Sequence, residues 1–309
     1  MASIELPAPS ASRASAALAA DPAVAFVELD RSRTIGAVPS DPRYPEQWSL
    51  PRIGWDAVHD GPAPSGHATV AVLDTGVDAA HADLRGVLLP GVSFVAGSPA
   101  DTDPNGHGTW MAGIVAARTD DGIGIAGIGY AGVSVLPVTV LGSDGTGRDS
   151  DIVAGVVYAV DSGADVILMS FSASGSSAAL QAAIDYAWSH DVIVVAATGN
   201  GGSSAPTYPA GDRSVIGVSS TDRSDRLAPG SNDGSDTFLA APGVDILTTD
   251  AGGGYESVSG TSAAAAEVAG AAALLRALDP TASNGVIVGR LARDASRAGT
   301  TAETGNGRL

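Results

Sequence analysis

The chain contains no cysteine and no lysine, and only 5% of its residues are aromatic. Without cysteine, neither a disulfide nor a thiolate-bound metal site is possible. Without lysine, all 16 basic residues are arginine, and 34 acidic residues leave a formal net charge of −18. Such a charge repels the phosphate backbone of nucleic acids and attracts cations. The composition therefore argues against a nucleic-acid partner.

Long apolar runs are also absent. No uninterrupted run reaches the roughly 18 residues that a membrane-spanning helix needs, so no membrane span is expected. The N-terminus lacks the basic start and apolar stretch of a secretory signal peptide. With 44% hydrophobic and 16% charged residues, the 309-residue chain has the composition of a globular protein with a large core.

The first part of the chain differs in pattern from the rest. Residues 1–36 form a Pro-, Ser- and Ala-rich leader with one strand-like stretch, Ala23–Asp30. Residues 37–67 are rich in Pro and Gly, which predicts a surface wrap. We therefore expect a leader over 1–36 and one domain over 37–309.

From residue 68 on, strand-like and helical patterns alternate. Short, mostly apolar and β-branched runs predict buried strands over 68–74, 133–140, 165–170, 191–197 and 214–220. Apolar residues at helical spacing lie between them, for example from Ile152 and from Leu180. The alternation predicts an α/β fold, with a doubly wound, mostly parallel sheet and helices on both faces.

Function in such sheets gathers where the strands end at their carboxyl side. Asp74 ends the first predicted strand, Ser170 and Phe171 lie at the end of the third, and Gly199 and Asn200 follow the fourth. An acid, a backbone edge and an amide donor are therefore expected along one rim of the sheet.

Four residues in this chain combine the chemistry of nucleophilic catalysis. Ser262 follows a glycine turn and opens a run of alanines, and His107 lies between two glycines. A serine hydroxyl becomes nucleophilic when a histidine takes its proton and a carboxylate, here Asp74, orients that histidine. Asn200 could donate its amide to a developing oxyanion. Alone, each has an ordinary interpretation as a helix cap, turn or surface residue, but together they predict catalysis.

These residues lie in the motifs VLDTGVD, NGHGTWMAG, ATGNGG and SGTSAAAAEVAG. With them the chain resembles the subtilisin family of serine peptidases, in its thermitase-like branch, over roughly residues 37–309. The resemblance implies a serine endopeptidase that hydrolyses peptide bonds through an acyl-enzyme. It implies that Asp74 orients the imidazole of His107 and that His107 acts as general base and then general acid. Ser262 would be the nucleophile, and the Asn200 amide would belong to the oxyanion hole.

Four positions depart from the family pattern. Ala263 stands where the family usually has Met, Ala266 and Glu267 stand for a Pro-His pair, and Trp110 stands for a His. They leave open two alternatives, a processing protease dedicated to one partner and a catalytically weakened, peptide-binding member of the same fold.

The resemblance also implies a polypeptide substrate that adds as a strand, so that its main chain is read before its side chains. The two segments that would receive it contain Gly145, Thr146 and Gly147, and Ser170, Phe171 and Ser172. The pocket for the residue before the cleaved bond would lie between 170–172 and 197–199, Gly199 included, with Thr207 near its floor. Because these walls carry no charged side chain, we expect the substrate residue before the cleaved bond to be uncharged.

One tight structural calcium site is implied as well. Its ligands would be side-chain oxygens of Asp41, Asp83 and Asp121 and backbone carbonyls of Arg118, Ile123 and Ile125. An all-oxygen set of this size suits Ca²⁺. The alternative is that these are solvated loop acids in an acidic protein.

Finally, the resemblance implies a secreted monomer. The leader 1–36 would be the C-terminal remnant of the chain's own inhibitory propeptide. A disordered leader is the alternative.

Overall fold

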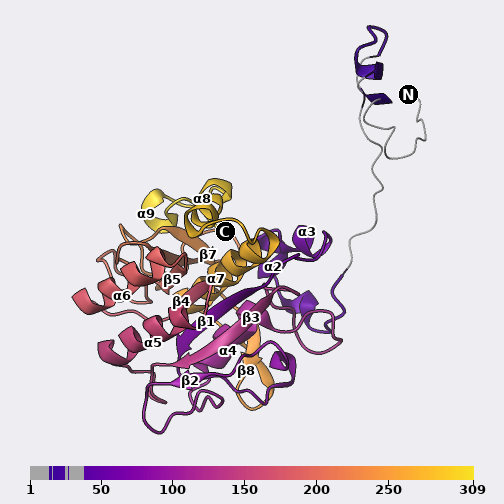
Figure 1. Ribbon diagram of the computed structural model, residues 1–309. Helices are drawn as coiled ribbons and strands as arrows, with labels where there is room; N and C mark the ends of the chain where they lie inside the picture. Colours follow the sequence, from indigo (N-terminus) through magenta and orange to yellow (C-terminus); the bar gives the residue numbers. More distant parts are fainter. Residues whose placement is uncertain (1–13, 16, 25–26, 28–37) are drawn as a thin grey trace. The chain divides into compact units, whose positions relative to one another are not determined.

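The computed structural model describes residues 14–15, 17–24, 27 and 38–309 (Figure 1). The chain divides into two units, Met1–Ala37 and Val38–Leu309. In the first unit, the Val24 N–H donates to the Asp21 carbonyl across a turn (2.9 Å). The remainder of the predicted strand Ala23–Asp30 lies largely outside the described residues.

The second unit is built on a seven-stranded sheet in the order β2-β3-β1-β4-β5-β6-β7, with every neighbouring pair parallel. The strands are β1 (Ala68–Asp74), β2 (Val92–Ser93), β3 (Val133–Thr139), β4 (Val166–Met169), β5 (Ile193–Ala197), β6 (Val215–Thr221) and β7 (Leu239–Pro242). The predicted fold class is confirmed, and the predicted runs coincide with β1, β3, β4, β5 and β6 within two residues. Strands β2 and β7 and the antiparallel hairpin of β8 (Ile246–Asp250) and β9 (Gly254–Val258) were not predicted.

Helices cover both faces of the sheet. Alternate residues of β1 pack to opposite sides, with Val70 and Val72 in the cluster that contains α4 and α7, and Ala71 and Leu73 in the cluster of α5 and α6. The main helices are α4 (His107–Ala116), α5 (Asp149–Asp161), α6 (Ala178–Ser189), α7 (Thr261–Leu278) and α8 (Asn284–Asp294). Figure 1 shows α5 and α6 side by side on one side of the unit, with α7 crossing its middle.

Short helices complete the described unit: η1 (Tyr44–Glu46), α2 (Ser49–Arg52), α3 (Trp55–His59), η2 (Ala82–Leu84) and α9 (Thr301–Thr304). The first three lie in the predicted surface wrap, and that prediction is incomplete. Leu50 and Trp55 are each 2% exposed, and the Trp55 indole N–H donates to the Ile128 carbonyl (2.9 Å). Large apolar side chains thus anchor this segment in the core.

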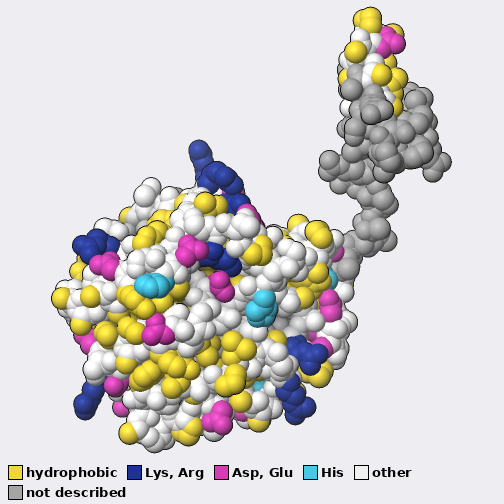
Figure 2. All heavy atoms as spheres, viewed as in Figure 1, with side chains coloured by type: hydrophobic (Ala, Val, Ile, Leu, Met, Phe, Trp, Pro, Cys, Tyr) yellow, Lys and Arg dark blue, Asp and Glu magenta, His cyan; other side chains and the backbone are white. Residues whose placement is uncertain are grey.

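Helix α7 is the central helix of the unit. By length and composition it could cross a membrane, with a mean hydropathy of 1.2 over 18 residues, but 78% of it is buried inside the fold. Its small residues allow close packing: a Cβ added to Gly270 would lie 3.0 Å from Ile128. We therefore assign it as the core helix of this domain. Charged side chains are scattered singly over the face shown in Figure 2 and do not gather into one patch among the described residues seen there.

Glu267, in the middle of α7, is a buried acid. Its side chain is fully buried, and neither carboxylate oxygen has a hydrogen-bond partner that meets normal geometry. Burial raises its pKa to about 8, opposed by the Ser49 hydroxyl and the Arg308 charge. At neutral pH the side chain is therefore mostly protonated.

We predict that Glu267→Gln changes the pH dependence of stability. The folded pKa exceeds the unfolded value, so stability from protonated Glu267 is complete below about pH 4.5 and is lost as pH rises through about 8. Relative to the Gln variant, the wild-type free energy of unfolding should fall by a few kcal/mol, about 1.4 per pKa unit, between pH 5 and 9. Urea unfolding at both pH values measures this.

The exposed Glu256 on β9 offers the matched control, since Glu256→Gln makes the same chemical change in solvent. Its stability should track wild type at both pH values. Parallel pH profiles for wild type and Glu267→Gln would contradict the prediction.

Candidate active site

The predicted catalytic residues come together at the carboxyl edge of the sheet. Asp74 is the last residue of β1, and Asn200 follows the end of β5. His107 is the first residue of α4 and Ser262 the second of α7. Since β1, β4 and β5 are adjacent and parallel, their carboxyl ends meet at one rim.

Asp74 and His107 form a direct hydrogen-bonded pair. The imidazole Nδ1 lies 2.8 Å and 2.9 Å from Asp74 Oδ1 and Oδ2. The Asp74 side chain is 1% exposed, that of His107 23%. Because the carboxylate accepts from Nδ1–H, the neutral ring keeps its lone pair on Nε2, where it can take a proton.

The Ser262 hydroxyl donates to a backbone carbonyl, that of Ser170 (2.8 Å), and the Ser170 hydroxyl donates in turn to the Ser262 carbonyl (3.3 Å). Among the described residues, the Ser262 hydroxyl has no hydrogen bond to His107. Rotation about the Cα–Cβ bond would be needed to turn the hydroxyl toward the imidazole. Hydrogen bonds of this kind are often loose before substrate arrives.

Asn200 is held by the residue before Ser262. Its Oδ1 accepts from the Thr261 N–H (2.9 Å) and hydroxyl (3.2 Å), and the Thr261 hydroxyl also accepts from the Gly199 N–H (3.0 Å). A Cβ on Gly260, at φ +149°, would lie 3.2 Å from Asn200 Nδ2. With Oδ1 occupied, Nδ2 is left as a donor beside the turn that presents Ser262.

Asp103 is a residue of this site that sequence reasoning missed. Oδ1 accepts from the Thr75 hydroxyl (2.8 Å) and the Gly106 N–H (2.9 Å), while Oδ2 accepts from the Thr109 N–H and hydroxyl (both 2.8 Å). It therefore ties the end of β1 to the start of α4, where His107 lies. The signal available in the sequence for this role was an acid four residues before a histidine that begins a helix.

These two acids control the charge on His107. Burial acts to lower its pKa, but the charge and hydrogen bond of Asp74 and the charge of Asp103 outweigh burial, so the pKa is raised above its usual value. The arrangement thus favours the imidazolium form once the ring has accepted a proton.

The two predicted substrate segments lie in the loops that follow β3 and β4. Gly145, Thr146 and Gly147 form a tight turn, in which the Gly142 N–H donates to the Thr146 carbonyl (2.8 Å). Ser170 directly follows β4, with Phe171 half-buried beside it. Ser172 and Gly199 are adjacent, since a Cβ on Gly199 would lie 2.6 Å from Ser172 Oγ.

A carboxylate lies against Thr207, although the predicted pocket walls have no charge. Asp236 Oδ2 accepts from the Thr207 N–H (2.9 Å) and hydroxyl (3.3 Å), and that hydroxyl also donates to the Thr198 carbonyl (2.6 Å). Asp236 is 6% exposed, so its charge is shielded from solvent. The sequence offered no signal for this contact, because Asp236 is 29 residues from Thr207.

The predicted calcium ligands occupy a second, separate region. Asp41 and Asp83 are 2% and 0% exposed. Asp41 Oδ1, Asp83 Oδ1 and Asp121 Oδ2 are buried without a hydrogen-bond partner, although Asp121 Oδ2 lies 3.5 Å from Arg118 Nε in an ion pair. Burial, together with the charges of Asp121 and Asp41, raises the pKa of Asp83 to about 7 against the opposing Ile125 N–H and Tyr255 hydroxyl.

These carboxylate oxygens do not by themselves complete a metal site. Among the described residues, no three acidic or histidine side chains form a ready-made metal cluster. The backbone carbonyls of Arg118, Ile123 and Ile125 accept no hydrogen bond within the described part of the chain. A cation would therefore need these carbonyls in addition to the three carboxylates.

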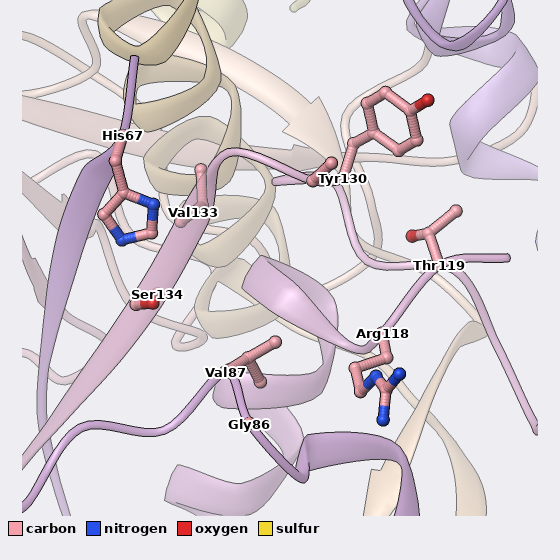
Figure 3. Close-up of a pocket in the computed structure, with 9 residues that line it drawn as sticks. His67, Gly86, Val87, Arg118, Thr119, Tyr130, Val133 and Ser134 are labelled. Carbon is pink, nitrogen blue, oxygen red and sulfur yellow. The ribbon is translucent and has the colours of Figure 1, made fainter. Parts of the chain in front are cut away.

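A pocket of about 200 Å³ lies at the opposite end of β1 and β3, where His67 precedes β1 and Ser134 belongs to β3 (Figure 3). His67 and Arg118 lie on opposite sides of it. It contains none of the residues predicted to be catalytic, so it does not compete with the rim of the sheet as the reactive site.

We predict that Asp103→Asn lowers the pKa of His107. The substitution removes a negative charge that favours the imidazolium and leaves Asp74 in place. A titration of the His107 ring by NMR measures the shift. Asp101→Asn, an exposed neighbour, is the control and should leave the titration unchanged. An identical His107 pKa in Asp103→Asn and wild type would refute the electrostatic role.

Comparison with known proteins identifies the family to which the chain belongs. The sequence profile of the subtilase family matches residues 65–307. Thermitase from Thermoactinomyces vulgaris is 40% identical over 252 residues, which cover 80% of this chain and 88% of that protein. A thermophilic serine proteinase from Bacillus sp. (strain AK1) is 42% identical over 233 residues, or 75% of this chain, and the chain spans only 57% of that protein's length.

A solved structure agrees in fold. A protease from Pseudoalteromonas arctica PAMC 21717 superimposes with a TM-score of 0.79 at 32% identity, over 88% of this chain and 97% of that one. Profile, sequence and fold thus agree over most of the domain 38–309. The chain belongs to the subtilase family of serine peptidases and is similar to its thermitase-like members.

Proposed function

We propose that this chain is a serine endopeptidase in which Asp74, His107 and Ser262 act as the catalytic triad and Asn200 supports the oxyanion. The observation that carries the proposal is the hydrogen bond of 2.8 Å between His107 Nδ1 and buried Asp74, at the rim where α7 presents Ser262. The pair supplies an oriented base beside a serine at a helix start.

In the proposed reaction, His107 Nε2 takes the proton of the Ser262 hydroxyl as Oγ attacks the peptide carbonyl. The negative charge then develops on the substrate oxygen, beside the Asn200 amide and the N–H groups at the start of α7. His107 returns its proton to the leaving amine, which leaves an acyl-enzyme on Ser262. Water, deprotonated by His107, hydrolyses this ester and restores the serine.

The substrate would be a polypeptide bound as an added strand between 145–147 and 170–172. Ser172, Gly199 and Thr207 would shape the pocket for the residue before the cleaved bond, with Asp236 behind Thr207. We further propose that the enzyme is a secreted monomer and that residues 1–36 are the remnant of its inhibitory propeptide. A processing protease with one partner would share this site but cleave few other substrates.

The prediction that tests the proposed function is labelling by a fluorophosphonate probe. Wild type should be labelled at Ser262 and should hydrolyse peptides. Ser262→Ala should lose labelling and lower kcat on the order of 10⁶, the size of the loss in subtilisin itself. Asn200→Ala should cost about 10²–10³, again the subtilisin figure.

Ser150→Ala, on the exposed start of α5, is the control and should behave as wild type. A wild-type protein that is folded but neither labelled nor active would favour the peptide-binding alternative. Substantial peptidase activity in pure Ser262→Ala would overturn the assignment of the nucleophile.

We also propose one structural calcium ion bound by Asp41, Asp83 and Asp121 with the carbonyls of Arg118, Ile123 and Ile125. The buried Asp41 Oδ1 and Asp83 Oδ1, which have no partner among the described residues, and the net charge of −18 support it, because such oxygens are costly to bury without a cation. Bound calcium would neutralise them and link the Asp41 segment to the loop 118–125.

For calcium, we predict that chelation lowers the melting temperature. In the Ser262→Ala background, where autolysis cannot interfere, EDTA should lower Tm on the order of 10 °C relative to calcium at a thousandfold excess over Kd. Asp83→Asn should abolish this calcium dependence, whereas the exposed Asp101→Asn should keep it. Equal Tm in calcium and in EDTA, after exhaustive dialysis, would refute the site.

A further inference from the structure

Trp110 forms a ring contact with the proposed catalytic histidine. It lies three residues after His107 on α4, a spacing that places both side chains on one side of the helix. The two rings have centroids 5.8 Å apart and planes inclined by 64°, an edge-to-face arrangement. The imidazole therefore has Asp74 at Nδ1 and the indole against its ring.

The indole is itself held at a fixed position. Its Nε1–H donates to Asp250 Oδ1 at the end of β8 (3.1 Å), and the Trp110 carbonyl accepts from the Thr248 hydroxyl (2.6 Å). The turn of this hairpin is tied to the chain after β1, since the Gly252 N–H donates to Asp78 Oδ2 (2.8 Å). The ring thus rests on the β8–β9 hairpin, a rigid element.

The turn before His107 also packs on this ring. Gly106 has φ +94°, and a Cβ added there would contact the Trp110 ring at 3.6 Å and Asp250 Oδ1 at 3.7 Å. Backbone turn, indole and carboxylate therefore lie together next to the imidazole. Movement of the indole would change the space available to the His107 ring.

We propose that Trp110, fixed by Asp250, is a positioning residue that holds the His107 imidazole in the orientation in which Nε2 can serve Ser262. This inference rests on the proposed function of His107. A hydrogen bond at Nδ1 alone does not fix the orientation of the imidazole plane. A second ring packed against the imidazole limits the range of orientations. An edge-to-face pair biases such an equilibrium by about three- to tenfold.

The test compares Trp110→Leu, Trp110→Phe and Asp250→Leu with wild type, with rates per site titrated by a fluorophosphonate. Trp110→Leu should lower kcat about three- to tenfold with little change in KM, since the ring contact orients the base and does not bind substrate. Trp110→Phe keeps a ring and should restore most of kcat. The kcat of Asp250→Leu should lie between those of Trp110→Leu and Trp110→Phe.

Trp188→Leu, on α6 away from α4, is the matched control and should keep wild-type kcat per titrated site. Equal kcat in Trp110→Leu and wild type, or an equal loss in Trp188→Leu, would overturn the proposal. Failure of Trp110→Phe to recover activity would overturn it as well.

A fluorescence titration tests the contact without turnover. Imidazolium quenches a neighbouring indole, so the difference in emission between wild type and Trp110→Phe should titrate with the His107 pKa. The pH dependence of this difference should vanish in a His107→Ala background. Trp55, stacked on His59 at 5.0 Å, contributes equally to both proteins and cancels. A flat difference curve would overturn the contact whether or not Ser262 is labelled, so this failure is separable from failure of the proposed function.

Discussion

The close packing of α7 against the sheet is the constraint on which the rest of this structure depends. Its alanines except Ala271, and Gly270, are buried, with Gly270 close to Ile128 and Val115. A helix of larger residues could not lie so near the sheet, and its first turn would then move away from the rim. The small side chains therefore place Ser262 and Thr261 beside Asn200 and Ser170.

Around that helix start, backbone and side-chain hydrogen bonds connect segments from distant parts of the chain. Thr261 links α7 to Gly199 and Asn200 after β5, and Asp103 links β1 to α4. The side chains of Thr261 and Asp103 are buried and have their partners, so they add rigidity at little desolvation cost. Glu267 is the contrast, a buried acid in the same helix whose oxygens lack good partners and whose pKa is raised to about 8.

Parallel strands and helices were predictable because burial on both faces requires continuous apolar runs, as in β1 and β5. Strand β7 was missed because Leu239–Pro242 is mostly alanine and proline, residues without strand propensity, and it is a strand only because β6 lies beside it. The hairpin β8–β9 did carry a signal, since glycines 252–254 follow the apolar and threonine-rich run of β8.

By itself, the sequence determined the order of β1, β3, β4, β5 and β6, the fold class and the four residues proposed for catalysis. Hydrophobic periodicity, glycine turns and the chemistry of single residues are local properties, so they can be recognised within one short motif. Only the tertiary structure decided that Asp103 ties the start of α4 to β1, that Trp110, held by Asp250, contacts the imidazole, and that Asp236 lies behind Thr207. The contacts of Trp110 and Thr207 with these acids join residues 140 and 29 positions apart, and which distant side chains meet depends on how the whole core packs.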